Sequence, residues 1–286
     1  MRDRRTRGRA ALRSGRLYAH RQTRLRRSLA AIVVVLLIFG AAACGGSDET
    51  GRQPTDAGGG KISGSITVFA AASLTEAFTK LGSQFEAIHL GTKVTLNFGA
   101  SSALADQIAQ GAPADVLATA DNKNMATVRS KGRVDEPMTF AQNRLAIIVG
   151  RGNPKRIGAL TDLAGPDVAF VLCAVEVPCG KLATEILKRA KVTAKPRSYE
   201  ENVKAVVTRV TLGEADAGVV YASDVHAAGS KAVGVRIPAH QNTIATYPIA
   251  VVKKSTNPST ATAFSEFVRS AAGQRVLTGA GFLPKP

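Results

Sequence analysis

The sequence predicts an α/β fold of two lobes, with mixed, mostly parallel sheets and an export segment in front. Strand-like and helix-like stretches alternate from residue 66 to the end of the chain, which is typical of α/β architecture. The alternation restarts after Asn143, so we expect the chain to cross to a second lobe and return. The expected borders are 62–142 plus 247–286 for lobe 1 and 143–246 for lobe 2.

The first 43 residues are predicted to be a secretory signal. Residues 1–29 contain eleven arginines and one acid, Asp3, and fifteen residues without a charge, 29–43, follow them. A basic region, a short apolar region and small residues before a cut site define such signals. Fifteen apolar residues are too few for a membrane span, which needs about 20.

Cys44 directly follows the small residues "AAA", an arrangement that resembles the lipobox of bacterial lipoproteins. The resemblance implies that Cys44 is acylated and anchors the protein to the outer side of the cell membrane. Ala41 stands where such motifs most often have leucine, and a plain signal peptide that leaves a secreted or periplasmic protein is the alternative.

The high positive charge of the chain is mostly a property of this N-terminal segment. The formal net charge is +17 for 286 residues, and residues 1–29 account for +10 of it. The remaining charge is spread without runs, and tryptophan is absent, which disfavours an aromatic platform for single-stranded nucleic acid. We therefore expect no nucleic-acid partner. The alternative, binding of DNA through the arginine tail, predicts that the mature protein from Cys44 binds DNA at moderate salt.

Residues 44–60 are rich in Gly, Ser, Thr and Asp and are predicted to be a flexible tether. After them, apolar periodicity predicts the elements of the fold. The expected strands are 66–70, 94–98, 115–118, 144–149, 168–172, 217–221 and 247–252. The expected helices are 74–88, a short one at 104–108, 122–131, 182–187, 203–210 and one around 264–268.

Four of the expected helices begin at small or polar residues where a ligand could reach the backbone. In "AAASL", Ser73 begins a helix and has Glu76 three residues on, the spacing of a capping box. "FGASS", "VPCG" and "YEENV" precede the other three helices. Unpaired N–H groups at helix N-termini bind anions, but serine is also an ordinary N-cap residue.

Cys173 and Cys179 remain as a pair once Cys44 is assigned to lipid. An even pair in an exported protein favours a disulfide, and a turn at Pro178 would bring the two within reach. Two free buried thiols are the alternative.

Several segments, in order, resemble the molybdate-binding proteins of ABC importers. They are "VFAAASLTEAF", "FGASSALADQIAQGAPADVLATAD", "VPCG", "ENV" and "GEADAGVVYASD", and the likeness extends from residue 62 to 286. The resemblance implies the type II periplasmic-binding-protein fold, with a hinge between two lobes and the ligand in the cleft between them. It also implies a monomer and delivery of the anion to a membrane permease. No Walker-type motif occurs in the chain, so the ATPase would be a separate subunit.

The resemblance also implies a set of ligand-binding residues and no catalytic residue, cofactor or cation site. Ser73 would donate its hydroxyl and its amide, and Ser101 and Tyr221 would donate hydroxyl groups. Cys179 and Val203 would donate backbone N–H groups, with Ser102 as a supporting neighbour. Many relatives have alanine where this chain has Cys179, but a backbone donor does not depend on its side chain.

These five positions contain donors and no carboxylate. Molybdate, tungstate and sulfate carry no proton at neutral pH and only accept hydrogen bonds, whereas phosphate keeps a proton and needs an acceptor. An unpaired buried group costs about 1–3 kcal/mol, so we expect phosphate to be rejected.

Two alternatives to a molybdate site stay open, and an iron site is disfavoured. The same fold could bind sulfate or another oxyanion, because sequence does not give the size of the site. A secreted α/β enzyme could use Cys179 or Ser73 as a nucleophile, although His89, His226 and His240 show no recognisable pairing with either. Iron-binding relatives of this fold use paired tyrosines, and nothing in the sequence pairs Tyr221 with Tyr247.

Overall fold

A computed structural model of the chain describes residues 62–286. These residues belong to one compact unit, Asp56–Pro286. The predicted signal peptide, the lipidation site Cys44 and the tether 44–60 lie outside the described residues and remain predictions.

The strands form one continuous sheet that we divide into two sections, because β4 (Met138–Gly150) changes partner along its length. In the first section the order is β2-β1-β3-β9-β4, with β1 parallel to β2 and β3, and β9 antiparallel to β3 and β4. The bounds are β1 Gly64–Ala71, β2 Thr92–Gly99, β3 Val116–Ala118 and β9 Ile244–Val251.

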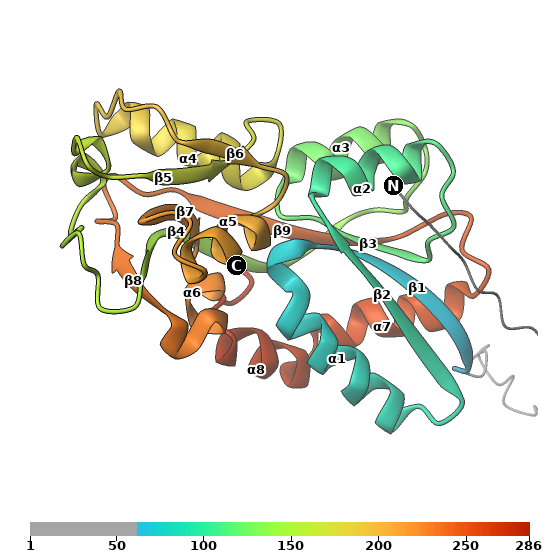
Figure 1. The fold of residues 1–286 in the computed structure, drawn as a ribbon. Coiled ribbons are helices and arrows are strands. Elements are labelled where there is room, and N and C mark those ends of the chain that lie inside the picture. Colours follow the sequence, from blue (N-terminus) through green and yellow to red (C-terminus); the bar gives the residue numbers. More distant parts are fainter. Residues whose placement is uncertain (1–61) are drawn as a thin grey trace, which may run out of the picture. The chain divides into compact units, whose positions relative to one another are not determined.

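Helices cover both faces of the first section (Figure 1). The helices α1 (Thr75–Ile88) and α7 (Pro258–Arg269) pack on one face, and α8 (Ala271–Gly279) packs on α1 and α7. The helices α2 (Ser101–Ala109) and α3 (Asn122–Ser130) cover the other. Successive side chains of β1 therefore point to opposite faces of the sheet. Phe69 packs with α2 and α3, whereas Val68 and Ala70 belong to the core under α1.

The second section begins where β4 leaves β9. Arg144 pairs with Ile244 of β9, and the next residue, Leu145, pairs with Tyr221 of β7. From β4 the order continues β7-β5-β6, with β8 also paired to β4. The bounds are β5 Phe170–Cys173, β6 Ser198–Glu200, β7 Ala217–Tyr221 and β8 Ala232–Arg236.

The helices α4 (Pro178–Arg189) and α5 (Val203–Thr211) lie on opposite sides of β5 in Figure 1. The helix α6 (Ala222–Ala228) continues directly from β7. Gly218 of β7 allows α5 to pack closely, because a Cβ atom at this position would lie 2.5 Å from a methyl carbon of Val206. Short 3-10 helices complete the fold at Ala72–Leu74, Leu160–Ala164 and Gly229–Lys231.

The mixed α/β architecture predicted from the sequence is confirmed. Every expected strand and helix is present, and the sequence patterns missed the short strands β6 and β8 and the helices α6 and α8. Parallel pairing holds for β1 with its neighbours and β5 with its neighbours, but all pairs made by β4 and β9 are antiparallel.

The predicted capping box at Ser73 is wrong. A 3-10 turn precedes α1, whose N-cap is Leu74, and no side chain caps it. Ser73 bonds instead to Tyr247, and Glu76 to Lys204, so both side chains are used in tertiary contacts.

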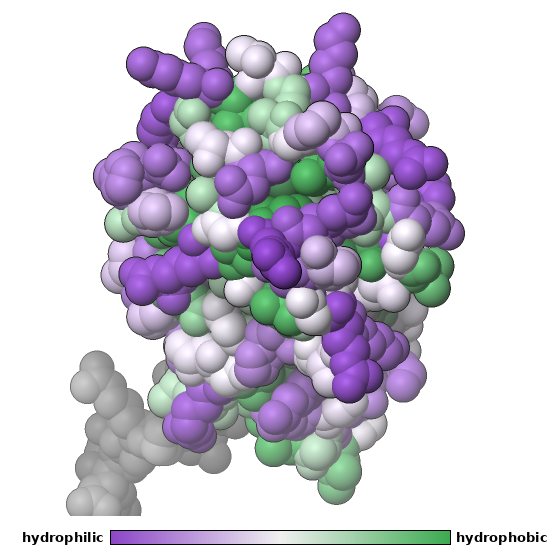
Figure 2. Space-filling view, turned by 60° about the vertical axis from the view of Figure 1, so that its left-hand side comes forward, coloured by the Kyte–Doolittle hydropathy of each residue, from purple (hydrophilic) through white to green (hydrophobic). Residues whose placement is uncertain are grey.

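On the face shown in Figure 2, hydrophobic side chains occur in small areas between hydrophilic ones. Scattered exposed apolar residues of this kind are normal for a folded domain. Within residues 62–286, none of the helices has the length and apolar character needed to cross a membrane.

Candidate functional site

All five predicted ligand residues line one small pocket between the two sheet sections. Ser73 and Ser101 come from the first section, and Cys179, Val203 and Tyr221 from the second. Each of the five is at most 3% exposed. The supporting residue Ser102 is half-buried and does not line the pocket.

The pocket lies where strands end and helices begin. Ser73 follows β1, Ser101 follows β2, Tyr221 ends β7, and Cys179 and Val203 lie at the starts of α4 and α5. In α/β sheets, ligands bind in the crevice outside the carboxyl ends of the strands. The arrangement is therefore the usual position of a binding site in this class of fold.

The lining is small and uncharged. The other residues around the pocket are Ala71, Ala72, Gly99, Ala100, Ala120, Val177, Pro178 and Asn202. The enclosed volume of the pocket is about 10 Å³, far below the roughly 300–1,000 Å³ of pockets for drug-sized ligands. A ligand that fits must be small and must come close to the backbone.

Helix N-termini supply backbone donors to this pocket. The N-cap residues of α2 and α4 are Ala100 and Val177, which have no side-chain acceptor. Asn202 caps α5, but its side chain accepts from Ala205. The N–H groups of Ser101, Cys179 and Val203 consequently have no acceptor among residues 62–286, and first-turn N–H groups of this kind are free to bind an anion.

The two serine hydroxyls are held by hydrogen bonds. The Oγ of Ser101 accepts a bond of 3.0 Å from the N–H of Ala120, so its own proton is free to be donated. The Oγ of Ser73 lies 2.9 Å from the hydroxyl oxygen of Tyr247, and either atom could be the donor. When Tyr247 donates, the proton of Ser73 is also free to point into the pocket.

The hydroxyl of Tyr221 is buried and has no hydrogen-bond partner in the described part of the chain. Its pKa is raised well above the usual value, chiefly by burial and then by the nearby hydroxyl of Tyr247 and the charges of Asp224 and Asp121. The group is therefore a neutral O–H donor at any physiological pH. An unpaired buried hydroxyl is costly, and a ligand acceptor in the pocket would pair it.

The predicted disulfide is confirmed, because Cys173 and Cys179 are bonded with their Cα atoms 5.9 Å apart. The bridge joins the end of β5 to the first turn of α4. Gly180 completes this tight connection, since a Cβ atom there would lie 2.0 Å from the carbonyl oxygen of Ala174. Together they fix the position of the Cys179 amide.

The sequence patterns missed Tyr247, Lys204 and Asp224, which surround the site without lining the pocket. Tyr247 contacts Tyr221 edge to face with ring centroids 5.8 Å apart, a contact that nothing in the sequence indicates. Asp224 lies three residues after Tyr221 and accepts its backbone N–H. The sequence could have indicated Asp224, because this spacing is typical of an acidic residue in a first helical turn.

A cation site is not apparent in the described residues. No group of three His, Cys, Asp or Glu side chains that could hold a metal ion occurs within residues 62–286. Burial raises the pKa of both Tyr221 and Tyr247, which disfavours the phenolate form that iron would need. The donor set instead matches an anion that only accepts hydrogen bonds.

Comparison with known proteins agrees with this geometry. Residues 66–283 match the family model described as bacterial extracellular solute-binding protein. The molybdate-binding protein ModA of Mycobacterium tuberculosis is 42% identical over 219 residues, which cover 76% of this chain and 84% of that protein.

Solved structures show the same architecture. The substrate-binding domain of a putative molybdenum ABC transporter from Clostridium difficile superposes with a TM-score of 0.61 at 31% identity, covering 78% of this chain and all of that one. The sulfate-binding protein SubI of M. tuberculosis superposes with a TM-score of 0.70 at 23% identity, covering 77% of this chain and 86% of that one. At that identity, SubI supports the fold alone.

Proposed function

The chain belongs to the bacterial extracellular solute-binding proteins and, within them, to the molybdate-binding proteins, and from this premise we propose that it captures molybdate, and tungstate as well, in the pocket between the two sheet sections. The ligand residues of this proposal are Ser73, Ser101, Cys179, Val203 and Tyr221. The members of this family bind solutes and are not enzymes.

The unpaired hydroxyl of Tyr221 is the observation that carries the proposal. It lines the same pocket as the free amides of Cys179 and Val203. A buried donor that lacks an acceptor is stabilised when a ligand supplies one. Molybdate offers four oxygen atoms and no proton, so it can accept from all of these groups at once.

The absence of a carboxylate from the lining supports selectivity against phosphate. None of the lining residues is charged, so no carboxylate would accept the proton of a hydrogen phosphate ion there. Sulfate has no such proton, and only the size of the enclosed space separates it from molybdate. A site that prefers sulfate is therefore the second candidate within the same fold.

An enzymatic use of the same residues has less support. Cys179 is in a disulfide, so it has no free thiol to act as a nucleophile. The hydrogen-bond partner of the Ser73 hydroxyl is Tyr247, whose raised pKa makes it a poor general base. The arrangement suits binding rather than bond cleavage.

We further propose that the two sections are lobes that move about the strand crossings in β4 and β9, with borders near residues 143 and 246. Within residues 62–286, the chain passes between sections only in these strands, which allows rotation of one section against the other. In the proposed cycle the lobes close over the anion and then deliver it to a membrane permease served by a separate ATPase.

The proposed location is the outer side of the cell membrane, with lipid on Cys44 as the anchor. Mass spectrometry of the mature protein, expressed in a bacterium that processes lipoproteins, tests this point. A diacylated N-terminal Cys44 is expected. An unmodified N-terminus at or after Cys44 would instead indicate a secreted protein.

Titration calorimetry of the soluble form, Lys61 to Pro286, tests the proposed ligand. We expect tight binding of molybdate and tungstate, weak binding of sulfate and no heat with phosphate. Equal affinity for sulfate and molybdate would favour the second candidate. A folded protein that binds none of the four anions would refute both.

A further inference from the structure

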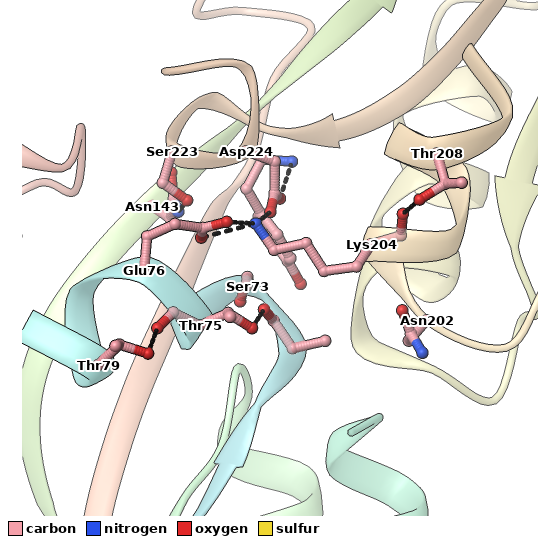
Figure 3. Close-up of polar contacts among 12 residues, drawn as sticks. Ser73, Thr75, Glu76, Thr79, Asn143, Asn202, Lys204, Thr208, Ser223 and Asp224 are labelled. Atoms are coloured by element: carbon pink, nitrogen blue, oxygen red, sulfur yellow. Dashed lines mark hydrogen bonds and ion pairs between the residues drawn. The ribbon is translucent and has the colours of Figure 1, made fainter. Parts of the chain in front are cut away.

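Three charged residues lie beside the proposed ligand residues without touching the pocket. Glu76 is three residues after Ser73, Lys204 directly follows Val203, and Asp224 is three residues after Tyr221. Figure 3 shows Glu76, Lys204 and Asp224 converging from three different helices, α1, α5 and α6. Their positions connect them to the pocket through the backbone.

Lys204 bridges the two carboxylates. Its Nζ lies 2.8 and 2.7 Å from the two oxygens of Glu76 and 3.3 Å from Oδ1 of Asp224. The side chains of Lys204, Glu76 and Asp224 are 25%, 51% and 0% exposed. The bonds to Glu76 have the short lengths of charge-assisted hydrogen bonds.

Asp224 anchors this bridge to the second section. Its Oδ2 accepts a 3.1 Å bond from the backbone N–H of Tyr221, and its carboxylate is fully buried. Lys204 and Asp224 both belong to the second section, so their ion pair holds α5 against α6. Only Glu76 comes from the first section.

The ion pair of Glu76 and Lys204 differs from the other ion pairs because its two residues come from different sections. Among the ion pairs between residues 62–286, it alone joins the two sections. The others connect residues of the same section, namely Lys93–Glu86, Arg129–Glu136, Arg189–Glu185, and Arg209 with Glu200 and Glu214.

We propose that Lys204 is a positioning residue which, by binding Glu76 across the boundary and Asp224 on its own side, fastens the two walls of the anion pocket together. This inference rests on the proposed function for the identity of the anion. Separation of the sections must break the contact with Glu76 and must also withdraw the amide of Val203 from Ser73. The ion pair therefore stabilises the enclosed state and slows release of the anion.

Glu76→Gln is the variant that tests this contact. It removes the charge that crosses the boundary and leaves Lys204 paired with buried Asp224, so the fold is retained. Replacing Lys204 itself would leave Asp224 unpaired and could unfold the protein. Glu185→Gln is the matched control, because it also removes a half-exposed acidic partner, but both members of its ion pair lie on α4.

Stopped-flow measurement of molybdate release from the soluble form is the first readout. Glu76→Gln should release the anion about three- to tenfold faster, with the association rate within about twofold of wild type, since affinity differences within one site arise mostly in dissociation. The difference should shrink as salt is raised, because exposed charges are screened. Glu185→Gln should match wild type.

Hydrogen–deuterium exchange of the anion-free protein is the second readout. Glu76→Gln should speed exchange in peptides on both sides of the boundary, around Ser73 and around Val203. If wild type binds molybdate and Glu76→Gln changes neither release nor exchange, the positioning role is refuted and the anion site stands. If wild type binds no anion while exchange rises only in Glu76→Gln, the role stands and the proposed ligand is wrong.

Discussion

The hydroxyl oxygens of Ser73 and Tyr247 lie 2.9 Å apart, although the two residues are 174 positions apart in the sequence. The contact joins the end of β1 to β9, the strand by which the chain returns from the second section. It places a residue outside the pocket in control of a hydroxyl that lines it.

Tyr247→Phe should therefore weaken anion binding through Ser73. The loss of one buried hydrogen bond is worth about 1 kcal/mol, so molybdate affinity should fall roughly fivefold. Calorimetry of Tyr247→Phe, Ser73→Ala and the double variant tests the coupling. If the two losses simply add, Tyr247 does not act through Ser73.

Tyr221→Phe should separate binding from stability. The buried hydroxyl has no partner within the described residues, so its removal should leave the melting temperature of the anion-free protein unchanged or higher. Hydrogen bonds to charged groups are worth about 1.5–3 kcal/mol, and molybdate affinity should fall by about ten- to a hundredfold. A variant that melts lower and binds normally would show that the hydroxyl is structural.

Gly180→Ala should destabilise the fold at the entry to α4. The added Cβ would lie 2.0 and 2.4 Å from the carbonyl oxygens of Ala174 and Cys173, and relief of such overlap typically costs 1–3 kcal/mol. Gly279→Ala is the control, because nothing lies within 4 Å of a Cβ there. Urea denaturation should show a lower midpoint for Gly180→Ala only.

Asp224 should make stability depend on pH. Burial raises the pKa of this carboxyl to about 6, while Lys204 and the backbone bond from Tyr221 oppose the shift and Glu76 adds to it. An ordinary carboxyl in the unfolded chain has a pKa of about 3.9. The native state then binds more protons than the unfolded state between these values, so this contribution to stability is complete below about pH 4 and is lost as pH rises through 6.

Comparison with Asp224→Asn isolates this effect, because the asparagine side chain has a similar shape and carries no proton that titrates over this range. Between pH 5 and 7.5, the free energy of unfolding of wild type should fall by about 1 kcal/mol relative to the variant. A difference that does not change with pH would mean that Asp224 titrates normally.

Much of this structure could be predicted from the sequence, and the reasons differ by element. The strand over 66–70 and the helix over 203–210 have strong apolar periodicity, and both are present. The strand Ser198–Glu200 has only three residues, and its one buried residue is Glu200, so no apolar pattern predicts its pairing with β5.

The site shows the same division. The five proposed ligand residues lie in local motifs at the starts of helices, so the family resemblance could identify them from the sequence. The structure brings all five into one pocket. The contacts of Tyr247 with Ser73 and of Lys204 with Glu76 join segments more than a hundred residues apart. No local pattern encodes such contacts. The spacing of Ser73 and Glu76 instead predicted a capping box, which the structure does not contain.

Anomalous diffraction from crystals of the soluble form grown with molybdate would locate the anion itself. The donor arrangement described above predicts one molybdenum peak, within hydrogen-bonding reach through its oxygens of the hydroxyls of Ser73, Ser101 and Tyr221 and the amides of Cys179 and Val203. A peak in the second cavity lined by Lys80 and Arg275, with this pocket empty, would contradict it.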